Sequence, residues 1–155
     1  MVSIGKKVTH FTLPASGATT LSLKDFSGTH LVLFFYPKDN TPGCTLEGQD
    51  FRDAWPEFKR AGAAVLGVSR DSVKSHDGFK AKHEFPYFLL SDADGLLCRQ
   101  FDVIREKSLY GRKFLGIERS TFLIDKKGML RQEWRKVRVK GHVNEVLQAV
   151  KLLPD

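Results

Sequence analysis

A continuous apolar run with the length of a strand, residues 31–36, is the feature that most limits what this chain can fold into. No polar residue interrupts the run, which is typical of a strand that is buried on both faces of a sheet. Two further runs of this kind follow at residues 63–68 and 122–125, and a shorter one lies at 88–90. The sequence therefore predicts a central sheet that is covered on both sides.

Helical patterns lie between these runs. Phe51, Trp55 and Phe58 recur at spacings of four and three residues, which marks one apolar face of a helix over about residues 44–61. Pro56 lies inside that segment, and a proline removes a helical hydrogen bond and crowds the preceding turn. We therefore expect this helix to be kinked or split in two near Trp55.

The remaining patterns complete an α/β domain. Further helices are predicted at residues 72–83, where Ser72 is a candidate N-cap, at 93–101 and at 143–153. A turn at residues 126–128, followed by a strand at about 129–137, predicts a late hairpin. Because strands alternate with helices and the hairpin must be antiparallel, we expect an α/β fold with a mixed central β-sheet flanked by helices.

The length of the chain, 155 residues, favours a single domain over residues 1–155, and no repeat or linker argues for a second one. The formal net charge is +7, which raises the question of anionic partners. However, the 25 Lys and Arg residues are spread along the chain rather than gathered in a stripe or a known module. We therefore expect a solvated basic surface and no nucleic-acid partner.

The cysteines and histidines indicate the compartment and exclude some chemistry. Two cysteines in a chain of this size favour a reducing compartment, and with no leader pattern we expect a cytoplasmic protein. No apolar run approaches the ~20 residues that cross a bilayer, so no membrane association is expected. Because no Cys/His pair has ligand spacing, we expect no metal and no cofactor. The five histidines are scattered and are predicted to lie at the surface: His10, His30, His76, His83 and His142.

Cys44 directly follows a turn that leaves the first apolar run, so it is predicted to stand at the start of a helix. Exposed N–H groups and the positive end of the helix dipole favour thiolate over thiol at such a position. Pro37 and Pro42 stiffen the turn, Thr41 brings a hydroxyl within reach of the sulfur, and Gly43 permits close approach of the backbone. An inert, buried cysteine is the alternative, but these neighbours favour a reactive thiol.

The spacing Pro37-x-x-x-Thr41-x-x-Cys44 resembles the active-site motif of the peroxiredoxins, and the longer segment 35–47 is similar to the PrxQ, or bacterioferritin comigratory protein, subfamily. The resemblance continues through three more segments, 65–69, 89–92 and 119–125, and so spans nearly the whole chain. It implies one thioredoxin-fold domain. It also implies a thiol peroxidase that acts as an antioxidant in cell redox homeostasis.

The resemblance also implies a role for each motif residue. Cys44 would attack hydrogen peroxide or an organic hydroperoxide and become a sulfenic acid, while Thr41 would orient the peroxide. Pro37 would shield the sulfenic acid, and Arg119 would stabilise the thiolate and polarise the peroxide, because a guanidinium stays charged and offers fixed donors. Glu47, one helical turn after Cys44, would help to order the pocket or would simply be a carboxylate favoured by the helix dipole.

The chain departs from the subfamily where the sulfenic acid must be reduced. The two usual positions of a resolving cysteine hold Gln49 and Lys80. Cys98, the remaining thiol, is expected to be structural, although it could be an atypical resolving cysteine if local unfolding brought the sulfurs together. The sequence therefore favours a one-cysteine mechanism in which an external thiol resolves Cys44. The candidate reductants are thioredoxin, glutaredoxin and a low-molecular-weight thiol such as glutathione.

Other functional classes fit less well. A thioredoxin-like disulfide reductase normally has Cys-x-x-Cys, and Cys44 has no second sulfur at that spacing. A cysteine hydrolase needs a histidine base beside its nucleophile, and no histidine has that signature. A non-enzymatic redox-sensing or holdase protein on the same fold remains open. The subfamily resemblance favours a monomer, while the physiological reductant and the peroxide preference are left open.

Overall fold

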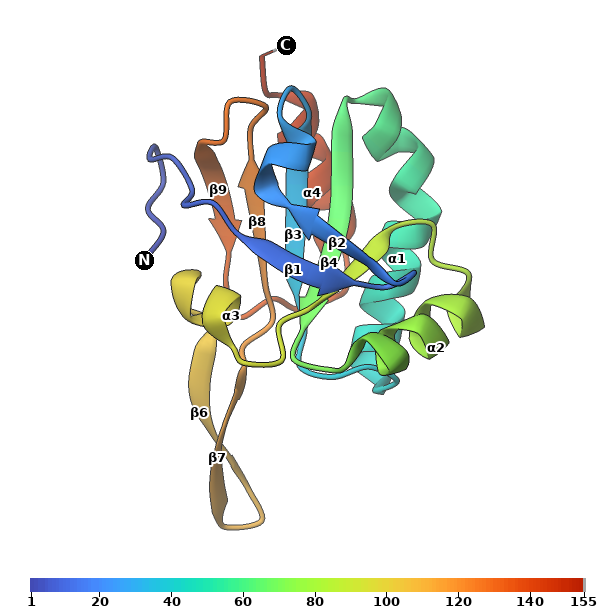
Figure 1. Cartoon of the computed structure of the whole chain (residues 1–155), viewed down its shortest axis with the longest axis vertical. Helices are drawn as coiled ribbons and strands as arrows, with labels where there is room; N and C mark the ends of the chain where they lie inside the picture. The colour runs from blue at the N-terminus through green and yellow to red at the C-terminus, as the bar shows by residue number, and fades with distance from the viewer. Residues whose placement is uncertain (155) are drawn as a thin grey trace.

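The apolar runs form the middle of a seven-stranded sheet in the computed structural model, which describes residues 1–154 (Figure 1). The strands of this sheet are β1 (Thr12–Ala15), β2 (Thr19–Ser22), β3 (His30–Phe35), β4 (Ala63–Ser69), β5 (Phe88–Ser91), β8 (Ser120–Ile124) and β9 (Leu130–Trp134). Their order is β2-β1-β5-β4-β3-β8-β9, with β3, β4 and β5 parallel and the outer strands antiparallel to their neighbours. The sheet is mixed, as predicted, and the late hairpin is its β8–β9 pair.

The side chains of β3 divide the core into two layers. Leu31, Leu33 and Phe35 belong to one buried cluster. Val32 and Phe34, which alternate with them, belong to the other cluster. Since successive side chains of a strand point to opposite faces, the two clusters lie on opposite sides of the sheet. This alternation explains why the apolar run is continuous.

The helices cover the two faces unequally. They are the short 3-10 helix η1 (Leu23–Phe26) and the α-helices α1 (Pro42–Arg60), α2 (Val73–His83), α3 (Leu96–Gln100) and α4 (His142–Lys151). Phe51 of α1, Phe79 of α2 and Val146 of α4 are all buried in the cluster that contains Phe34. Leu97 of α3 is buried in the opposite cluster. Three helices therefore cover one face, and α3 with the N-terminal segment covers the other (Figure 1).

Helix α1 is one continuous element with Pro56 inside it, so of the two expected outcomes, a kink or a split near Trp55, the split does not occur. Phe51 and Phe58, on either side of the proline, are fully buried in the same core cluster. Their shared burial holds both halves of the helix against the sheet and offsets the local cost of the proline. The Ser72 cap of α2 is as predicted, because its hydroxyl accepts a hydrogen bond from the backbone N–H of Ser75 at 3.1 Å.

A second, two-stranded sheet was not predicted. Strands β6 (Ile104–Leu109) and β7 (Arg112–Ile117) form a hairpin that projects from the end of the molecule at which α1 begins (Figure 1). Its two-residue turn has positive φ at Tyr110 (51°) and Gly111 (78°). Positive φ at both central residues is typical of the type I′ turn, which commonly joins the two strands of a hairpin.

Three of the five histidines are buried, so the expectation that all of them lie at the surface is wrong. His30, His76 and His142 are each less than 5 % exposed. Buried polar groups need partners, and distant segments supply them here. The Nε2 atom of His142 lies 2.8 Å from Oγ1 of Thr121, for example. No helix among residues 1–154 is both long enough and apolar enough to cross a membrane.

Candidate active site

Cys44 lies in the first turn of α1, directly beyond the end of β3. Thr41 precedes the helix with an extended backbone (φ −88°, ψ 152°), and Pro42 takes the first helical position, where a missing N–H costs nothing. Cys44 is therefore the third helical residue, among the N–H groups that have no partner within the helix. Its side chain is buried, with 2 % of its surface exposed. The predicted order of strand, turn and thiol is present.

Thr41 keeps its hydroxyl oxygen available to a ligand. The Oγ1–H group donates to the carbonyl oxygen of Lys38 at 2.8 Å within the same turn. Since its proton is used in this way, the lone pairs on Oγ1 can accept a hydrogen bond from a bound group. Pro37 opens this turn and is half-buried, and Asn40 completes it with a left-handed backbone (φ 64°).

Arg119 reaches Cys44 because β8 pairs with β3. Phe35, the last residue of β3, lies opposite Ser120, the first residue of β8, so the residue before β8 stands beside the turn that carries Cys44. Arg119 Nη2 donates to Cys44 Sγ at 3.5 Å. Arg119 Nη1 donates to Oε1 of Glu47 at 2.7 Å. The guanidinium thus links the sulfur to a carboxyl group on the next turn of α1.

Gly43 makes room for this contact. A β-carbon at position 43 would lie 3.0 Å from Arg119 Nη2, which is tighter than ordinary packing allows. The absence of a side chain therefore lets the guanidinium lie directly over the start of α1. Gly43 is therefore required for space beside Arg119 as well as for the close approach of the backbone that was predicted from the sequence.

Glu47 is fully buried, which accounts for its altered acidity. Burial raises the pKa of its carboxyl to about 7, although the charge and hydrogen bond of Arg119 act in the opposite direction. Its second oxygen, Oε2, has no hydrogen-bond partner among the described residues. Burial alone would lower the pKa of Arg119, but the negative charges of Glu47 and Cys44 outweigh burial and raise it. Arg119 is therefore charged at any working pH.

Comparisons with known proteins place the chain in a family. The AhpC/TSA family profile matches residues 4–133. Peroxiredoxin Bcp of Xanthomonas campestris is 58% identical over 90% of this chain and 87% of its own length. Peroxiredoxin Bcp of Bacillus subtilis is 49% identical over 97% and 96% of the two chains. The chain is a peroxiredoxin of the Bcp/PrxQ group.

Solved structures of this group have the same fold. A PrxQ mutant from Xylella fastidiosa superposes with a TM-score of 0.93 at 49% identity, covering 97% of this chain and 96% of that one. The bacterioferritin comigratory protein of X. campestris, studied for its alkyl peroxide reduction activity, gives a TM-score of 0.87 at 57% identity, covering 91% and 90%. The predicted family and thioredoxin-like fold are confirmed, and the chain is a thiol peroxidase.

The buried carboxyl of this peroxiredoxin predicts how stability changes with pH. The folded protein holds a proton on Glu47 up to about pH 7, whereas the unfolded chain loses it near the ordinary value of 4.5. Between these values the folded state binds more protons, so stability is highest below the window and falls as pH rises through it. We expect the free energy of unfolding to fall by up to about 3 kcal/mol from this group.

Denaturant unfolding at several pH values between 4 and 8 measures this effect. Glu47→Gln keeps the shape of the side chain but cannot titrate. The difference between the two proteins isolates Glu47 from other groups that titrate in the same range. Parallel stability curves for wild type and Glu47→Gln would show that the carboxyl ionises normally in the folded peroxiredoxin.

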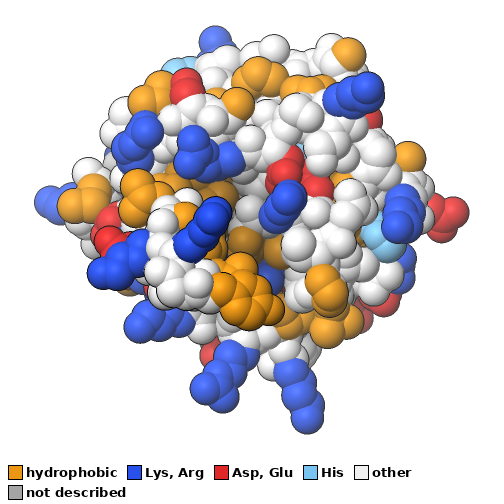
Figure 2. Space-filling model, turned by 90° about the horizontal axis from the view of Figure 1, so that it is seen from below, with side chains coloured by type: hydrophobic (Ala, Val, Ile, Leu, Met, Phe, Trp, Pro, Cys, Tyr) orange, Lys and Arg blue, Asp and Glu red, His pale blue; other side chains and the backbone are white. Residues whose placement is uncertain are grey.

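Lys107 is a third charged neighbour, which sequence reasoning missed. Strand β6 carries it beside the site, where its Nζ donates to the carbonyl oxygen of Ile117. Burial lowers the pKa of this amine and the nearby Arg119 charge lowers it further, while Cys44 acts in the opposite direction. Viewed from the hairpin end, Lys and Arg side chains surround an apolar area (Figure 2). Strand β6 has four consecutive polar residues between Ile104 and Leu109, so no alternation of polar and apolar residues marked it as a strand.

Cys98 lies in a different part of the core from Cys44. It is fully buried on α3, in the cluster on the other face of the sheet. Burial raises the pKa of its thiol, and the neighbouring Asp92 carboxylate raises it further. That carboxylate also accepts the backbone N–H of Cys98 at 2.7 Å, which fixes the start of the helix. These surroundings suit an inert, packed thiol.

The positions of the usual resolving cysteines are filled by side chains with other contacts. Gln49 lies on α1 with its amide nitrogen 3.5 Å from Nδ1 of His83. Lys80 lies on α2, where its Nζ donates to the carbonyl oxygens of Phe85 at 2.8 Å and Tyr87 at 2.7 Å. Lys80 therefore ties the end of α2 to the segment that follows it.

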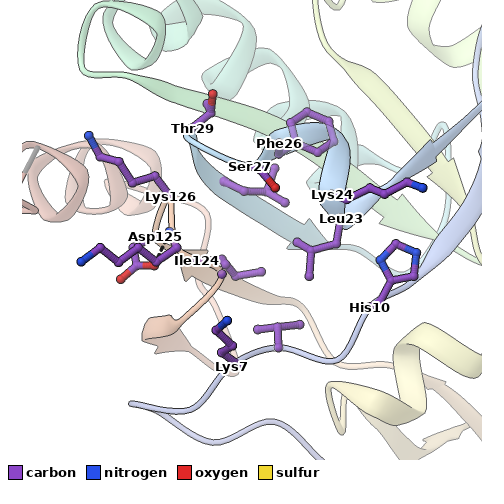
Figure 3. Close-up of a pocket in the computed structure, with 14 residues that line it drawn as sticks. Lys7, His10, Leu23, Lys24, Phe26, Ser27, Thr29, Ile124, Asp125 and Lys126 are labelled. Carbon is purple, nitrogen blue, oxygen red and sulfur yellow. Dashed lines mark hydrogen bonds between the residues drawn. The ribbon is translucent and has the colours of Figure 1, made fainter.

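A pocket at the far end of the sheet is separate from this site. Lys7, His10 and Lys24 are among its lining residues, and so are Leu31 near the start of β3 and Ile124 at the end of β8 (Figure 3). Cys44 follows the opposite end of β3. None of the catalytic candidates lines this pocket.

Proposed function

We propose that this peroxiredoxin reduces hydrogen peroxide and organic hydroperoxides at Cys44, with Thr41, Pro37 and Arg119 assisting. The observation that carries the proposal is the 3.5 Å contact between Arg119 Nη2 and Cys44 Sγ at the start of α1. A guanidinium and helix N–H groups there stabilise negative charge on sulfur. The alkyl peroxide reduction activity of the X. campestris relative supports organic hydroperoxides as substrates.

The geometry suits the following reaction. The Cys44 thiolate attacks the terminal oxygen of the peroxide, the S–O bond forms and the O–O bond breaks. Sulfur becomes a sulfenic acid, and the leaving oxygen takes a proton and departs as water or an alcohol. Oγ1 of Thr41 accepts a hydrogen bond from the peroxide, and Arg119 stabilises the charge that moves onto the leaving oxygen. Pro37, at the start of the turn, shields the sulfenic acid.

An external thiol then resolves the sulfenic acid in the mechanism that we propose. The positions of Gln49 and Lys80 provide no sulfur, and Cys98 packs on the other face of the sheet from Cys44. A thiol from outside attacks the sulfenic sulfur, releases water and forms a mixed disulfide. A second thiol opens that disulfide and restores the Cys44 thiol.

A peroxiredoxin acts on a peroxide and needs a thiol reductant. We propose thioredoxin, glutaredoxin or glutathione for that reductant, and a monomeric enzyme formed by one domain over residues 1–155. We place the enzyme in the cytoplasm, because each turnover must return Cys44 to the thiol and a reducing compartment keeps thiols reduced.

Peroxide consumption with each of the three reductants in excess tests this function. We expect at least one of them to support many turnovers per Cys44. A redox sensor or holdase on this fold would oxidise once and stop. Failure of all three reductants, together with no reaction between Cys44 and peroxide, would overturn the proposed function.

Cys98→Ser separates the two mechanisms of resolution. Because Cys98 is buried away from Cys44, we expect the variant to turn over within about twofold of wild type. Mass spectrometry of the wild type after one equivalent of peroxide should show Cys44 as sulfenic acid or as an adduct with added thiol. Loss of turnover in the variant and an intramolecular disulfide in the wild type would instead make Cys98 the resolving cysteine.

A further inference from the structure

One peptide group in the catalytic turn, the one between Lys38 and Asp39, is held at both of its polar ends. Its carbonyl oxygen, on Lys38, accepts the Thr41 hydroxyl at 2.8 Å. Its N–H, on Asp39, donates to Oδ2 of Asp71 at 3.0 Å. The direction of the Thr41 hydroxyl therefore depends on a peptide plane that a carboxylate outside the turn keeps in place.

Asp71 is itself fixed by the sheet. It follows β4, whose end lies beside the end of β3 because the two strands are parallel. Its Oδ2 also accepts the Ser69 hydroxyl at 2.5 Å, and its backbone carbonyl accepts the Ser91 hydroxyl at 2.6 Å. Ser69 of β4 thus holds the carboxylate of Asp71, and Ser91 of the neighbouring strand β5 holds its backbone.

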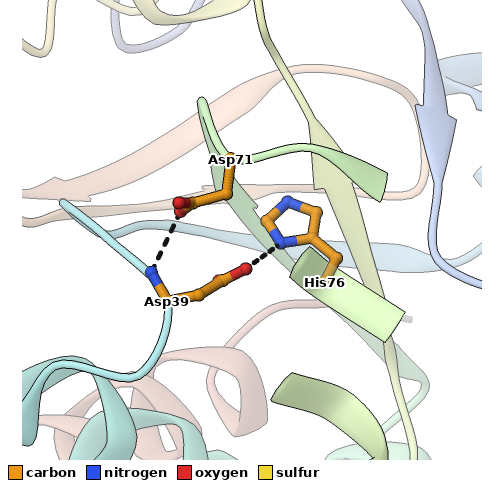
Figure 4. Close-up of side chains that lie close together, drawn as sticks. All are labelled: Asp39, Asp71 and His76. Atoms are coloured by element: carbon orange, nitrogen blue, oxygen red, sulfur yellow. Dashed lines mark hydrogen bonds and ion pairs between the residues drawn. The ribbon is translucent and has the colours of Figure 1, made fainter. Parts of the chain in front are cut away.

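The side chain of Asp39 is held by hydrogen bonds, and one of its partners is His76 of α2 (Figure 4). Its Oδ1 accepts the Tyr36 hydroxyl at 2.6 Å, while Oδ2 accepts the Ser75 hydroxyl at 2.8 Å and lies 2.7 Å from Nδ1 of His76. The other ring nitrogen of His76 lies 2.8 Å from the carbonyl oxygen of Leu90. Both ring nitrogens of His76 thus lie within hydrogen-bond distance of an oxygen atom, which fixes the orientation of the ring.

The same three side chains offer atoms within 4.8 Å of one another that could ligate a metal: Asp39, Asp71 and His76. Their hydrogen bonds account for the geometry without an ion. Asp39 and His76 are paired at 2.7 Å in a buried position, and Asp71 is occupied by a backbone N–H and a hydroxyl. Hydrogen-bond networks of this kind fix one arrangement of the groups that they join.

We propose that Asp71 and His76 are positioning residues for Thr41. Neither contacts Cys44. Asp71 accepts a hydrogen bond from the backbone N–H of Asp39, which belongs to the peptide group between Lys38 and Asp39. His76 contacts the side-chain carboxylate of the same Asp39. Together they keep the Thr41 hydroxyl donating to Lys38, so that its lone pairs face an incoming peroxide. The inference rests on the proposed role of Thr41, and it assigns peroxide orientation to residues outside the Pro37–Cys44 motif.

Two rates measured on the full-length protein test this role. The first is the single-turnover rate of Cys44 oxidation by hydrogen peroxide. The second is the rate at which iodoacetamide alkylates Cys44, which needs the thiolate but not Thr41. For Asp71→Ala and His76→Gln we expect the peroxide rate to fall about tenfold, since small misplacements of an orienting group have effects of this size or larger. Alkylation should stay within twofold of wild type.

Thr41→Val provides the decisive comparison. Once the hydroxyl is gone, Asp71→Ala should cause no further loss, because both changes remove the same orientation. Asp71→Asn keeps an oxygen that can accept the Asp39 N–H and should recover most of the peroxide rate. His83→Gln, a histidine on the same helix outside the network, is the matched control and should behave as wild type.

Three other outcomes of these measurements would overturn the proposal, and each has a different cause. Equal losses of peroxide reaction and alkylation would show a general loosening of the site. Additive losses in the double variant would show that Asp71 acts independently of Thr41. If Thr41→Val reacts normally, the proposed role of Thr41 fails and this inference with it, while peroxidase activity at Cys44 stands. Should His76→Gln fail to fold, the half-buried Asp71 still decides the question.

Discussion

Replacing Cys44 with serine is expected to abolish peroxide reduction, to below about 0.1% of the wild-type rate. A serine hydroxyl does not ionise at neutral pH, so neither the helix start nor Arg119 can produce a nucleophile from it. The change exchanges one buried atom for a smaller one at a site that is 2 % exposed, so the fold should persist. Peroxide consumption in the presence of excess thiol measures the loss.

Cys98→Ser is the matched control for this prediction. It makes the same chemical change at a thiol that is also buried, but whose pKa is raised by burial and by Asp92. It should leave the first step, oxidation by peroxide, unchanged. Residual activity in Cys44→Ser that disappears when Cys98 is also replaced would show that the second thiol can react with peroxide, contrary to its surroundings in this fold.

The parts of the fold that were predicted correctly depend on local patterns. The run at 31–36 reports a strand buried on both faces, because each of its side chains enters one of the two core clusters. The position of Cys44 after that strand follows from residues next to it in the chain. Cys44, Thr41 and Pro37 could therefore be selected from the sequence before any contact was known.

Features created by distant contacts were recognised by resemblance or missed. Arg119 lies 75 residues from Cys44 and reaches it through the pairing of β3 with β8, which no local pattern encodes. The β6–β7 hairpin has few buried side chains, so it lacks the apolar run that marks the central strands, and Lys107 was missed with it. His76 was misplaced for the same reason, since its partner Asp39 comes from another segment.

Arg119→Met is expected to slow the reaction of Cys44 with hydrogen peroxide by about 10²–10³-fold, the usual effect of removing one donor from a developing negative charge. Methionine fills much of the space of the arginine stem but supplies no charge and no hydrogen bond. The wild-type guanidinium contacts both Cys44 Sγ and the Glu47 carboxyl. Its loss removes the cation that, in the proposed mechanism, stabilises the leaving oxygen. Single-turnover oxidation at several peroxide concentrations measures the effect.

Three further variants separate the charge of Arg119 from its position. Arg119→Lys keeps the charge but cannot reach two partners with a rigid fork, so an intermediate rate is expected. Gly43→Ala keeps the arginine but places a β-carbon 3.0 Å from its Nη2, and should slow the reaction by displacing the guanidinium. Adding Glu47→Gln to Arg119→Met removes the unpaired buried carboxyl, which should restore stability without restoring the rate. Recovery of the peroxide rate in that double variant would mean that Arg119 serves only to neutralise Glu47, and the leaving oxygen would then need another donor.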